Sequence, residues 1–220
     1  EYQDAAKFTF IYVIVSVVIE IILGLFLAFL FNRRIYGRGF MRSLMILPIF
    51  ATPFAIGFMF FTILFEISGP LAWMGIPFLS NHNWAPFSVM LVDIWQWTPF
   101  CFLVFLAALQ GIPDDLIEAA TLDTKSAYKI WTSVILPLLQ PIIVLVILLR
   151  VAESAKLYDY IASLTKGGPG TATQSVSFLV FNKAFKMNDF GYASAGSFLM
   201  LIVVMVFVML FFTRLRKTYE

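Results

Sequence analysis

The chain has 220 residues, of which 61% are hydrophobic and only 13% are charged, and its formal net charge is +2. In a soluble domain about a quarter of the residues are charged, and the mean hydropathy here is +0.91. This composition excludes an ordinary soluble domain and places the chain in a lipid bilayer. The small net charge, with no single basic patch, argues against a nucleic-acid partner. The single cysteine, Cys101, provides neither a disulfide framework nor a cysteine-based metal site.

Five apolar segments are long enough to cross the hydrocarbon core as helices, which takes about 20 residues. They span residues 8–31, 44–65, 87–109, 138–161 and 195–213. They are too long for buried strands, and spanning strands would alternate apolar and polar residues. Pro48, Pro53 and Pro99 would break soluble helices, but bilayer helices tolerate proline, so we expect kinks there. The sequence therefore predicts an all-α, polytopic transmembrane helix bundle with five spans, forming one membrane domain over residues 1–220.

The basic residues indicate which side of the membrane each connection occupies. Nine fall on one side, namely Arg33, Arg34, Arg38, Arg42, Lys125, Lys129, Arg214, Arg216 and Lys217, and four on the other, namely Lys7, Lys166, Lys183 and Lys186. Short cytoplasmic loops carry the excess of Lys and Arg, so we expect the first side, with the C-terminus, to be cytoplasmic. An odd number of spans then places Glu1 outside. Because the chain does not begin with Met, we expect at least one further span upstream in the full gene product.

A charged stretch over residues 111–137 separates the third and fourth apolar segments and is predicted to begin with a helix. Pro113 suits the first helical position, and Asp114 and Asp115 favour the positive end of the helix dipole. A helix that lies on lipid headgroups usually has a polar face rich in Lys and Arg. This one is acidic through its first turns and carries small alanines where another protein could approach closely. We therefore expect it to dock onto a cytosolic protein.

The same stretch carries a family resemblance. Glu118-Ala119-Ala120, then Asp123, then Ile135-Leu136-Pro137 resembles the "EAA" loop of permease subunits in binding-protein-dependent ABC importers. Residues 93–100 (DIWQWTPF), 164–169 (LTKGGP) and 191–195 (GYASA) resemble the sugar and polyol branch, of the maltose and glycerol-3-phosphate type. Together these matches extend over about residues 44–213.

The resemblance implies that the coupling segment, residues 111–137, contains a helix that sits in a groove on a cytosolic ATPase. The residues implied in this contact are Leu116, Glu118, Ala119, Ala120 and Asp123. The family usually has Gly after the Asp, and here the residue is Thr124, which suits a positive-φ turn poorly. Either the turn is built differently in this chain or the glycine is not needed for its dihedral angles.

The resemblance also implies the partners. A second, related permease would complete the pathway as a heterodimer, two cytosolic ATPase subunits would bind ATP and Mg²⁺, and an extracytoplasmic binding protein would deliver the cargo. The external segment 163–193, with Lys166, Gly167, Gly168 and Pro169, would face that binding protein. The run Gly167-Gly168-Pro169-Gly170 by itself predicts a tight turn. The chain has no G-x-x-x-x-G-K-[ST], H-E-x-x-H or G-x-S-x-G motif, so we expect no catalysis by it and no cofactor bound to it. The implied location is the plasma (inner) membrane of a prokaryote.

Polar residues within the spans are candidates for the translocation pathway, because burying them in lipid is costly. The fourth segment carries Arg150, Glu153, Lys156 and Asp159 at a spacing of three, and such neighbours can form an ion-pair ladder along one helix. Arg150 lies near mid-span and Ser154 one turn further out, and we favour these two as residues that line the cavity.

The third segment supplies an acid, an amide and aromatic rings: Asp93, Gln96, Trp97 and Phe100. Such a surface suits sugars and polyols, because C–H groups stack on aromatic rings while hydroxyls need donors and acceptors. Trp95 and Trp97 could instead belong to an interfacial belt or to the core. Glu20, in the middle of the first segment, is expected to pair within the bundle or against the second permease.

We conclude that the sequence favours an importer permease for a carbohydrate or polyol, and three alternatives stay open. A permease for an amino acid or an ion would share the coupling segment. A secondary transporter would also place charges mid-span, but its usual signature is a pair of repeated halves, and no internal repeat is found. A membrane anchor without a pathway predicts that replacing Arg150 or Asp93 leaves uptake unchanged.

Overall fold

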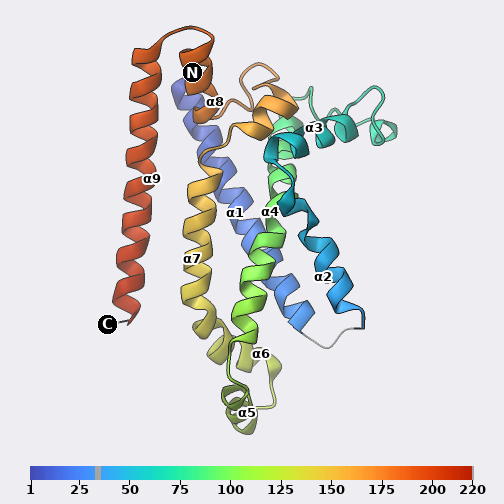
Figure 1. Cartoon of the computed structure of the whole chain (residues 1–220), viewed down its shortest axis with the longest axis vertical. Coiled ribbons are helices and arrows are strands. Elements are labelled where there is room, and N and C mark those ends of the chain that lie inside the picture. The colour runs from blue at the N-terminus through green and yellow to red at the C-terminus, as the bar shows by residue number, and fades with distance from the viewer. Residues whose placement is uncertain (33–35, 220) are drawn as a thin grey trace.

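The computed structural model describes residues 1–32 and 36–219, with side chains up to Thr213, and this part of the chain is helical without strands. The helices are α1 (Tyr2–Asn32), α2 (Arg38–Ile46), α3 (Pro53–Leu64), α4 (Trp84–Gln110), α5 (Asp114–Asp123), α6 (Ala127–Ile130), α7 (Leu136–Ser154), α8 (Val176–Phe185) and α9 (Phe190–Tyr219). Short 3₁₀ or π turns lie between them: η1 (Leu47–Phe50), η2 (Ala72–Met74), η3 (Trp131–Ile135) and η4 (Ile161–Thr165). Figure 1 shows α1, α4 and α7 bundled together, with α9 standing to one side.

The long helices form because their sequences are predominantly apolar, and small residues let them approach. A Cβ added at Gly24 of α1 would lie 2.5 Å from the Cβ of Cys101 in α4, so the two helix backbones meet closely, as small residues permit in membrane helices. One apolar core surrounds Ala28, Phe102 and Leu139. A second, around Tyr12 and Ile161, lies toward the other end of the bundle.

The predicted second span, 44–65, is not one kinked helix. The helical stretches Arg38–Phe50 and Pro53–Leu64 meet at an angle of 101°. Ala51 between them is extended, and Thr52 caps α3 by accepting a hydrogen bond from the Ala55 amide. The residue before a proline is disfavoured in helical conformation, so Pro53 begins a new helix instead of bending an old one. Four helical stretches in the described residues are long and apolar enough to span a membrane, or five if this bent pair counts as one.

The fourth span also differs from the prediction of 138–161. Its helical stretch runs over Ala127–Ser154 and ends there. The carbonyls of Ala155 and Leu157, beyond the end of α7, accept hydrogen bonds from the hydroxyls of Ser177 and Ser175. Serine side chains of the following segment thus donate to carbonyl groups that would accept hydrogen bonds from backbone amides if the helix continued.

The segment 163–193 contains a helix that was not predicted from the sequence. This helix, α8, begins after Ser175, whose hydroxyl accepts a hydrogen bond from the Phe178 amide. The last span, predicted as 195–213, belongs to the longer helix α9, which begins at Phe190.

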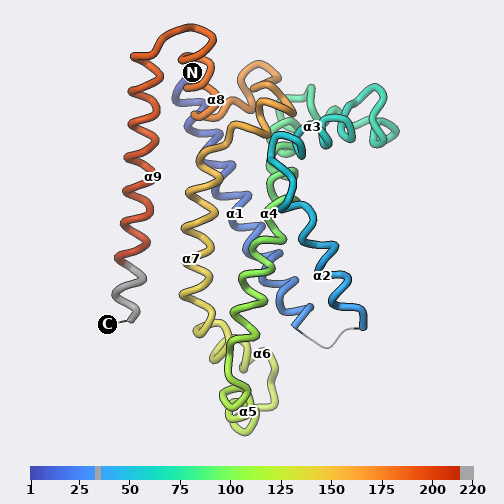
Figure 2. The backbone as a smooth tube through the Cα atoms, in the orientation of Figure 1, coloured from blue at the N-terminus to red at the C-terminus, as the bar shows by residue number. Residues whose placement is uncertain are grey.

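The connections fall at two opposite ends of the bundle. The end of α1, helices α5 and α6, and the end of α9 lie at one end, which we call the α5 end (Figures 1 and 2). The N-terminus and α8 lie at the other, the α8 end. The start of α2, helices α5 and α6, and the end of α9 thus share one end of the bundle. Arg33 and Arg34 lie outside the described residues, as do the side chains of Arg214, Arg216 and Lys217.

Candidate functional site

A buried arginine lies at the centre of the bundle. Arg150 of α7 is 1% exposed. It donates to both carboxylate oxygens of Glu20 in α1, with Nε–Oε2 at 2.6 Å and Nη2–Oε1 at 2.9 Å. Its Nη2 also lies 3.3 Å from both oxygens of Asp93 in α4 and 3.0 Å from the Ser154 hydroxyl. One guanidinium therefore joins three helices.

Charge burial explains this arrangement. A lone charge in an apolar interior is costly and is retained only where it is paired and hydrogen-bonded. The planar guanidinium matches a carboxylate with two parallel hydrogen bonds, which a lysine cannot do. The prediction that Glu20 pairs within the bundle or against a second permease is resolved in favour of the bundle.

The ion-pair ladder considered for the fourth span forms only in part. Arg150 pairs across the bundle, and the one ladder contact among Arg150, Glu153, Lys156 and Asp159 is Lys156 Nζ to Glu153 Oε1 at 3.1 Å, with both side chains exposed. The helix ends at Ser154, so Asp159 lies beyond the helical i, i+3 spacing. The deeper Arg150 has nearer partners on the facing helices.

An aromatic and polar network continues from the arginine. The guanidinium stacks over the ring of Trp97 with its Cζ 4.5 Å from the ring centroid. The indole of Trp97 donates to the Tyr160 hydroxyl at 3.1 Å, and that hydroxyl donates to Gln96 Oε1 at 2.7 Å. Gln96 Nε2 in turn donates to the Ala51 carbonyl at 2.8 Å. The network thus reaches the break between η1 and α3.

A cavity of about 190 Å³ opens beside this network. Asp93, Trp97, Arg150 and Ser154, four of the six residues predicted for the pathway, line it. Its wall combines an aromatic face with carboxylate, guanidinium and hydroxyl groups, which suits a hydroxyl-rich solute. The volume is below the range of about 300–1,000 Å³ typical of ligand sites.

The other two predicted pathway residues do not line this cavity. The Gln96 side chain is buried with both ends of its amide hydrogen-bonded. Phe100 packs against the apolar core around Phe102. Tyr12 and Tyr160, which the sequence analysis did not select, do line the cavity. In the sequence, a single tyrosine in an apolar segment looks the same whether it lines a cavity or lies at the membrane interface. No local signal therefore identifies Tyr12 and Tyr160 as cavity residues.

The predicted coupling residues lie on a helix that projects from the α5 end. No residue of α5 is buried, and Leu122 is 89% exposed. Asp114 and Asp115 occupy its first turn as predicted, while Pro113 is the cap before it instead of its first residue. Thr124 is extended, with φ −152° and ψ 139°, and its hydroxyl accepts from the Ser126 amide. This chain therefore needs no glycine at position 124, because a β-branched residue favours the extended conformation.

The predicted tight turn at the α8 end is present. Lys166 and Gly167 have positive φ, 53° and 89°, and the Gly168 amide donates to the Thr165 carbonyl. The Thr173 hydroxyl donates to the Gly168 carbonyl at 2.7 Å and holds the turn against the chain that leads to α8. Lys166 is exposed at this turn.

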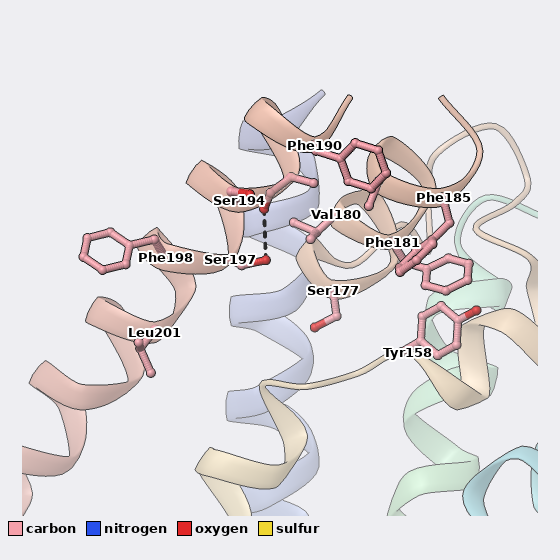
Figure 3. Close-up of a pocket in the computed structure, with 12 residues that line it drawn as sticks. Tyr158, Ser177, Val180, Phe181, Phe185, Phe190, Ser194, Ser197, Phe198 and Leu201 are labelled. Carbon is pink, nitrogen blue, oxygen red and sulfur yellow. Dashed lines mark hydrogen bonds between the residues drawn. The ribbon is translucent and has the colours of Figure 1, made fainter. Parts of the chain in front are cut away.

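A second, larger groove of about 650 Å³ lies between α8 and α9 (Figure 3). Phe181, Phe185 and Phe198 contribute aromatic rings to it, and the Ser177 and Ser197 hydroxyls lie at its wall. No residue predicted for the pathway belongs to this groove. Among the described residues, no group of three or more His, Cys, Asp or Glu could hold a metal ion.

Comparison with known proteins accounts for this combination of a helix bundle, a buried charged cluster and a projecting acidic helix. Residues 20–220 match the family described as "Binding-protein-dependent transport system inner membrane component". The chain belongs to this family. It is a permease subunit of an ABC importer, and the resemblance of its EAA segment is thereby confirmed at the level of the family.

Individual relatives support the same assignment. The permease is 38% identical over 205 residues to the trehalose/maltose transport system permease protein MalF of Thermococcus litoralis, covering 90% of this chain and 69% of the relative. It is 30% identical over 226 residues to the multiple sugar-binding transport system permease protein MsmF of Streptococcus mutans, covering 100% and 78%. A crystal structure of a bacterial ABC transporter that imports the acidic polysaccharide alginate has the same fold, with a TM-score of 0.87 at 22% identity over 99% of this chain and 80% of that one.

Proposed function

We propose that this permease forms half of a pathway that carries a carbohydrate or polyol inward across the plasma membrane of a prokaryote. The observation that carries the proposal is the placement of Trp97, Arg150 and Asp93 on one cavity wall. An aromatic ring beside charged groups can stack on C–H faces and hydrogen-bond to hydroxyls. The extensive similarity to permeases named for trehalose/maltose and for multiple sugars supports the same cargo class.

A second permease would complete the site. The cavity in this chain is small for a ligand site. The helix α9 is also largely uncovered, because only 6% of its most apolar 18-residue stretch is buried. A related chain packed alongside, forming a heterodimer, would enlarge the cavity and cover exposed apolar helix surface. An extracytoplasmic binding protein would deliver the cargo at the α8 end, where segment 163–193 and its turn at Lys166 lie.

The helix α5 would transmit ATP-driven motion. None of its residues is buried, so the helix is accessible to another protein. One of two cytosolic ATPase subunits, which would bind ATP and Mg²⁺, would contact the helix through Leu116, Glu118, Ala119, Ala120 and Asp123. Their closure on ATP would then move α4 and α7 through the segments that flank α5. In this proposal the α5 end and the C-terminus are cytoplasmic.

The test is ATP hydrolysis by the reconstituted importer with its binding protein and a panel of sugars, polyols and amino acids. We expect one sugar or polyol to stimulate hydrolysis in the wild type, and Glu118→Ala to abolish the stimulation. Asp115→Ala is the matched control, because Asp115 is an exposed carboxylate on the same helix outside the EAA motif. Stimulation by an amino acid alone would overturn the cargo class. Unchanged stimulation in Glu118→Ala would overturn the coupling role of this residue.

A further inference from the structure

Gln96 occupies an unusual position between the cavity and the break in the second span. It is 1% exposed in the middle of α4. Its amide oxygen accepts the Tyr160 hydroxyl, and its amide nitrogen donates to the Ala51 carbonyl. Both ends of the side chain are therefore engaged, one with a cavity residue and one with the backbone at the break.

The backbone at the break explains why a donor is needed there. In a continuous helix the Ala55 amide would donate to the Ala51 carbonyl. Here that amide donates to the Thr52 hydroxyl instead, at 3.4 Å, because Thr52 caps the new helix α3. Gln96 Nε2 takes the place of the missing helical donor at 2.8 Å. Broken membrane helices need such replacement partners, since lipid offers none.

The helix α3 also rests on the segment that carries Tyr160. A Cβ added at Gly57 of α3 would lie 1.8 Å from the Ser163 hydroxyl oxygen and 3.6 Å from the Tyr160 Cα, so the two backbones are in close contact. Tyr160 meanwhile accepts a hydrogen bond from the Trp97 indole, and Trp97 supports the Arg150 guanidinium. A shift of Tyr160 or Trp97 at the cavity wall therefore reaches α3 by two routes, through Gln96 and through direct packing.

We propose that Gln96 is a positioning residue that fixes the 101° bend between α2–η1 and α3 and links this bend to the cavity wall through Tyr160. Loss of its donor frees the Ala51 carbonyl and lets α3 change its angle. Cargo that contacts Trp97 or Tyr160 competes for their hydrogen bonds and so releases the bend. The second step rests on the proposed function, whereas the fixing of the bend does not.

The bend can be measured directly with spin labels on its two limbs. Met41 in α2 and Thr62 in α3 are exposed, and their cysteine variants can be labelled on a Cys101→Ala background. The importer complex isolated with the full-length chain is placed in nanodiscs for double electron–electron resonance. We expect a single narrow distance distribution with Gln96 present. In Gln96→Leu we expect a shift of the mean that exceeds the width of that distribution.

The variant Gln96→Glu separates the donor from the shape of the side chain. An ionised carboxylate can still accept from Tyr160 but cannot donate to Ala51, whereas a protonated carboxyl can do both. We expect a distance near the wild-type value while the carboxyl is protonated and the altered distance once the pH is raised enough to ionise it, an effect that loss of packing would not produce. Because Glu20, Asp93, Arg150 and the hydroxyls of Tyr12 and Tyr160 lie around the same network, the wild type is measured over the same pH range as a reference.

Gln110→Leu is the matched control, since Gln110 is an exposed glutamine at the end of the same helix, and it should leave the distance unchanged. An unchanged distance in both Gln96→Leu and Gln96→Glu would overturn the role of Gln96. Adding the binding protein loaded with the stimulating sugar should shift the wild-type distribution in the same direction as Gln96→Leu. A wild-type distance that does not respond to cargo would overturn the link to the cavity and leave the fixing of the bend standing.

Discussion

Arg150 and Glu20 form a bidentate ion pair between α7 and α1, although 130 positions separate them in the sequence. Both side chains are almost fully buried, at 2% and 0% exposed. The pair fixes how the first and fourth spans face each other, and with Asp93 it sets the wall of the cavity. The contribution of this ion pair to the stability of the bundle can be tested without a transport assay.

Breaking this pair should destabilise the bundle. Glu20→Gln leaves the buried guanidinium short of one charged partner, and removing one member of a buried pair costs about 3–5 kcal/mol. Cys101 is 0% exposed, so the rate at which it reacts with a thiol-reactive dye on heating reports unfolding. We expect a clearly lower unfolding temperature for Glu20→Gln. Glu153→Gln, which breaks the exposed pair with Lys156, should change it little, and equal effects of the two variants would contradict the prediction.

The close approach of α1 and α4 gives a second stability prediction. In Gly24→Ala the new methyl group meets the Cys101 side chain and, at 3.0 Å, the backbone of α4. Neither helix can yield locally, so we expect a loss of about 1–3 kcal/mol, as for other overpacked sites. The same dye assay measures it. Gly39→Ala is the control, because nothing lies within 4 Å of its added Cβ, and a Gly24→Ala protein as stable as this control would disprove the close contact.

The loop before α4 should respond to acid. Burial alone would raise the pKa of Glu66, but hydrogen bonds from the Ser80 hydroxyl and from the amides of Ser80 and Leu79 hold the pKa below its ordinary value. A lowered pKa in the folded state contributes stability that is present above the ordinary pKa, about 4.3, and is lost as the pH falls through the lowered value. The loop should therefore stay ordered at neutral pH and loosen in acid.

A spin label at Trp73, which is 80% exposed in this loop, measures the effect on the Cys101→Ala background. In the wild type we expect label mobility to rise only once the pH falls below the ordinary glutamate pKa of about 4.3. In Glu66→Gln it should be high already at neutral pH and should change little with pH. Ser80→Ala removes one of the three hydrogen bonds and should give an intermediate result. A rigid loop in Glu66→Gln at neutral pH would show that the carboxylate is not needed.

Trp97 should matter for transport because its ring supports Arg150 at the cavity wall. Trp97→Leu removes a cation–π contact worth about 1–2 kcal/mol, so we expect uptake at saturating loaded binding protein to fall about fivefold or more. The control is Trp95→Leu: Trp95 is 42% exposed, packs edge-on against Phe60 and does not line the cavity. Comparable losses of uptake in the two variants would indicate that aromatic packing, and not the cavity wall, accounts for the effect.

The sequence by itself determined the all-α membrane fold, the family and the exposed acidic helix, because each depends on local composition or on a short ordered motif. It also selected Arg150, Asp93 and Trp97, which line one cavity in the structure, since polar groups within apolar spans are costly and therefore informative. Local pattern did not determine the extended conformation of Thr124. It predicted a kink at Pro53, but not that the helix would break there and turn by 101°.

Only the tertiary structure decided which partners these residues choose. Local spacing favoured Glu153 as the partner of Arg150, but the facing helices bring Glu20 and Asp93 within hydrogen-bonding distance. Gln96 likewise was selected for its polarity, and its two hydrogen bonds to Tyr160 and Ala51 depend on how α4 packs against two distant segments. Pairing across a bundle is set by the relative placement of helices, which residue spacing within one helix does not encode.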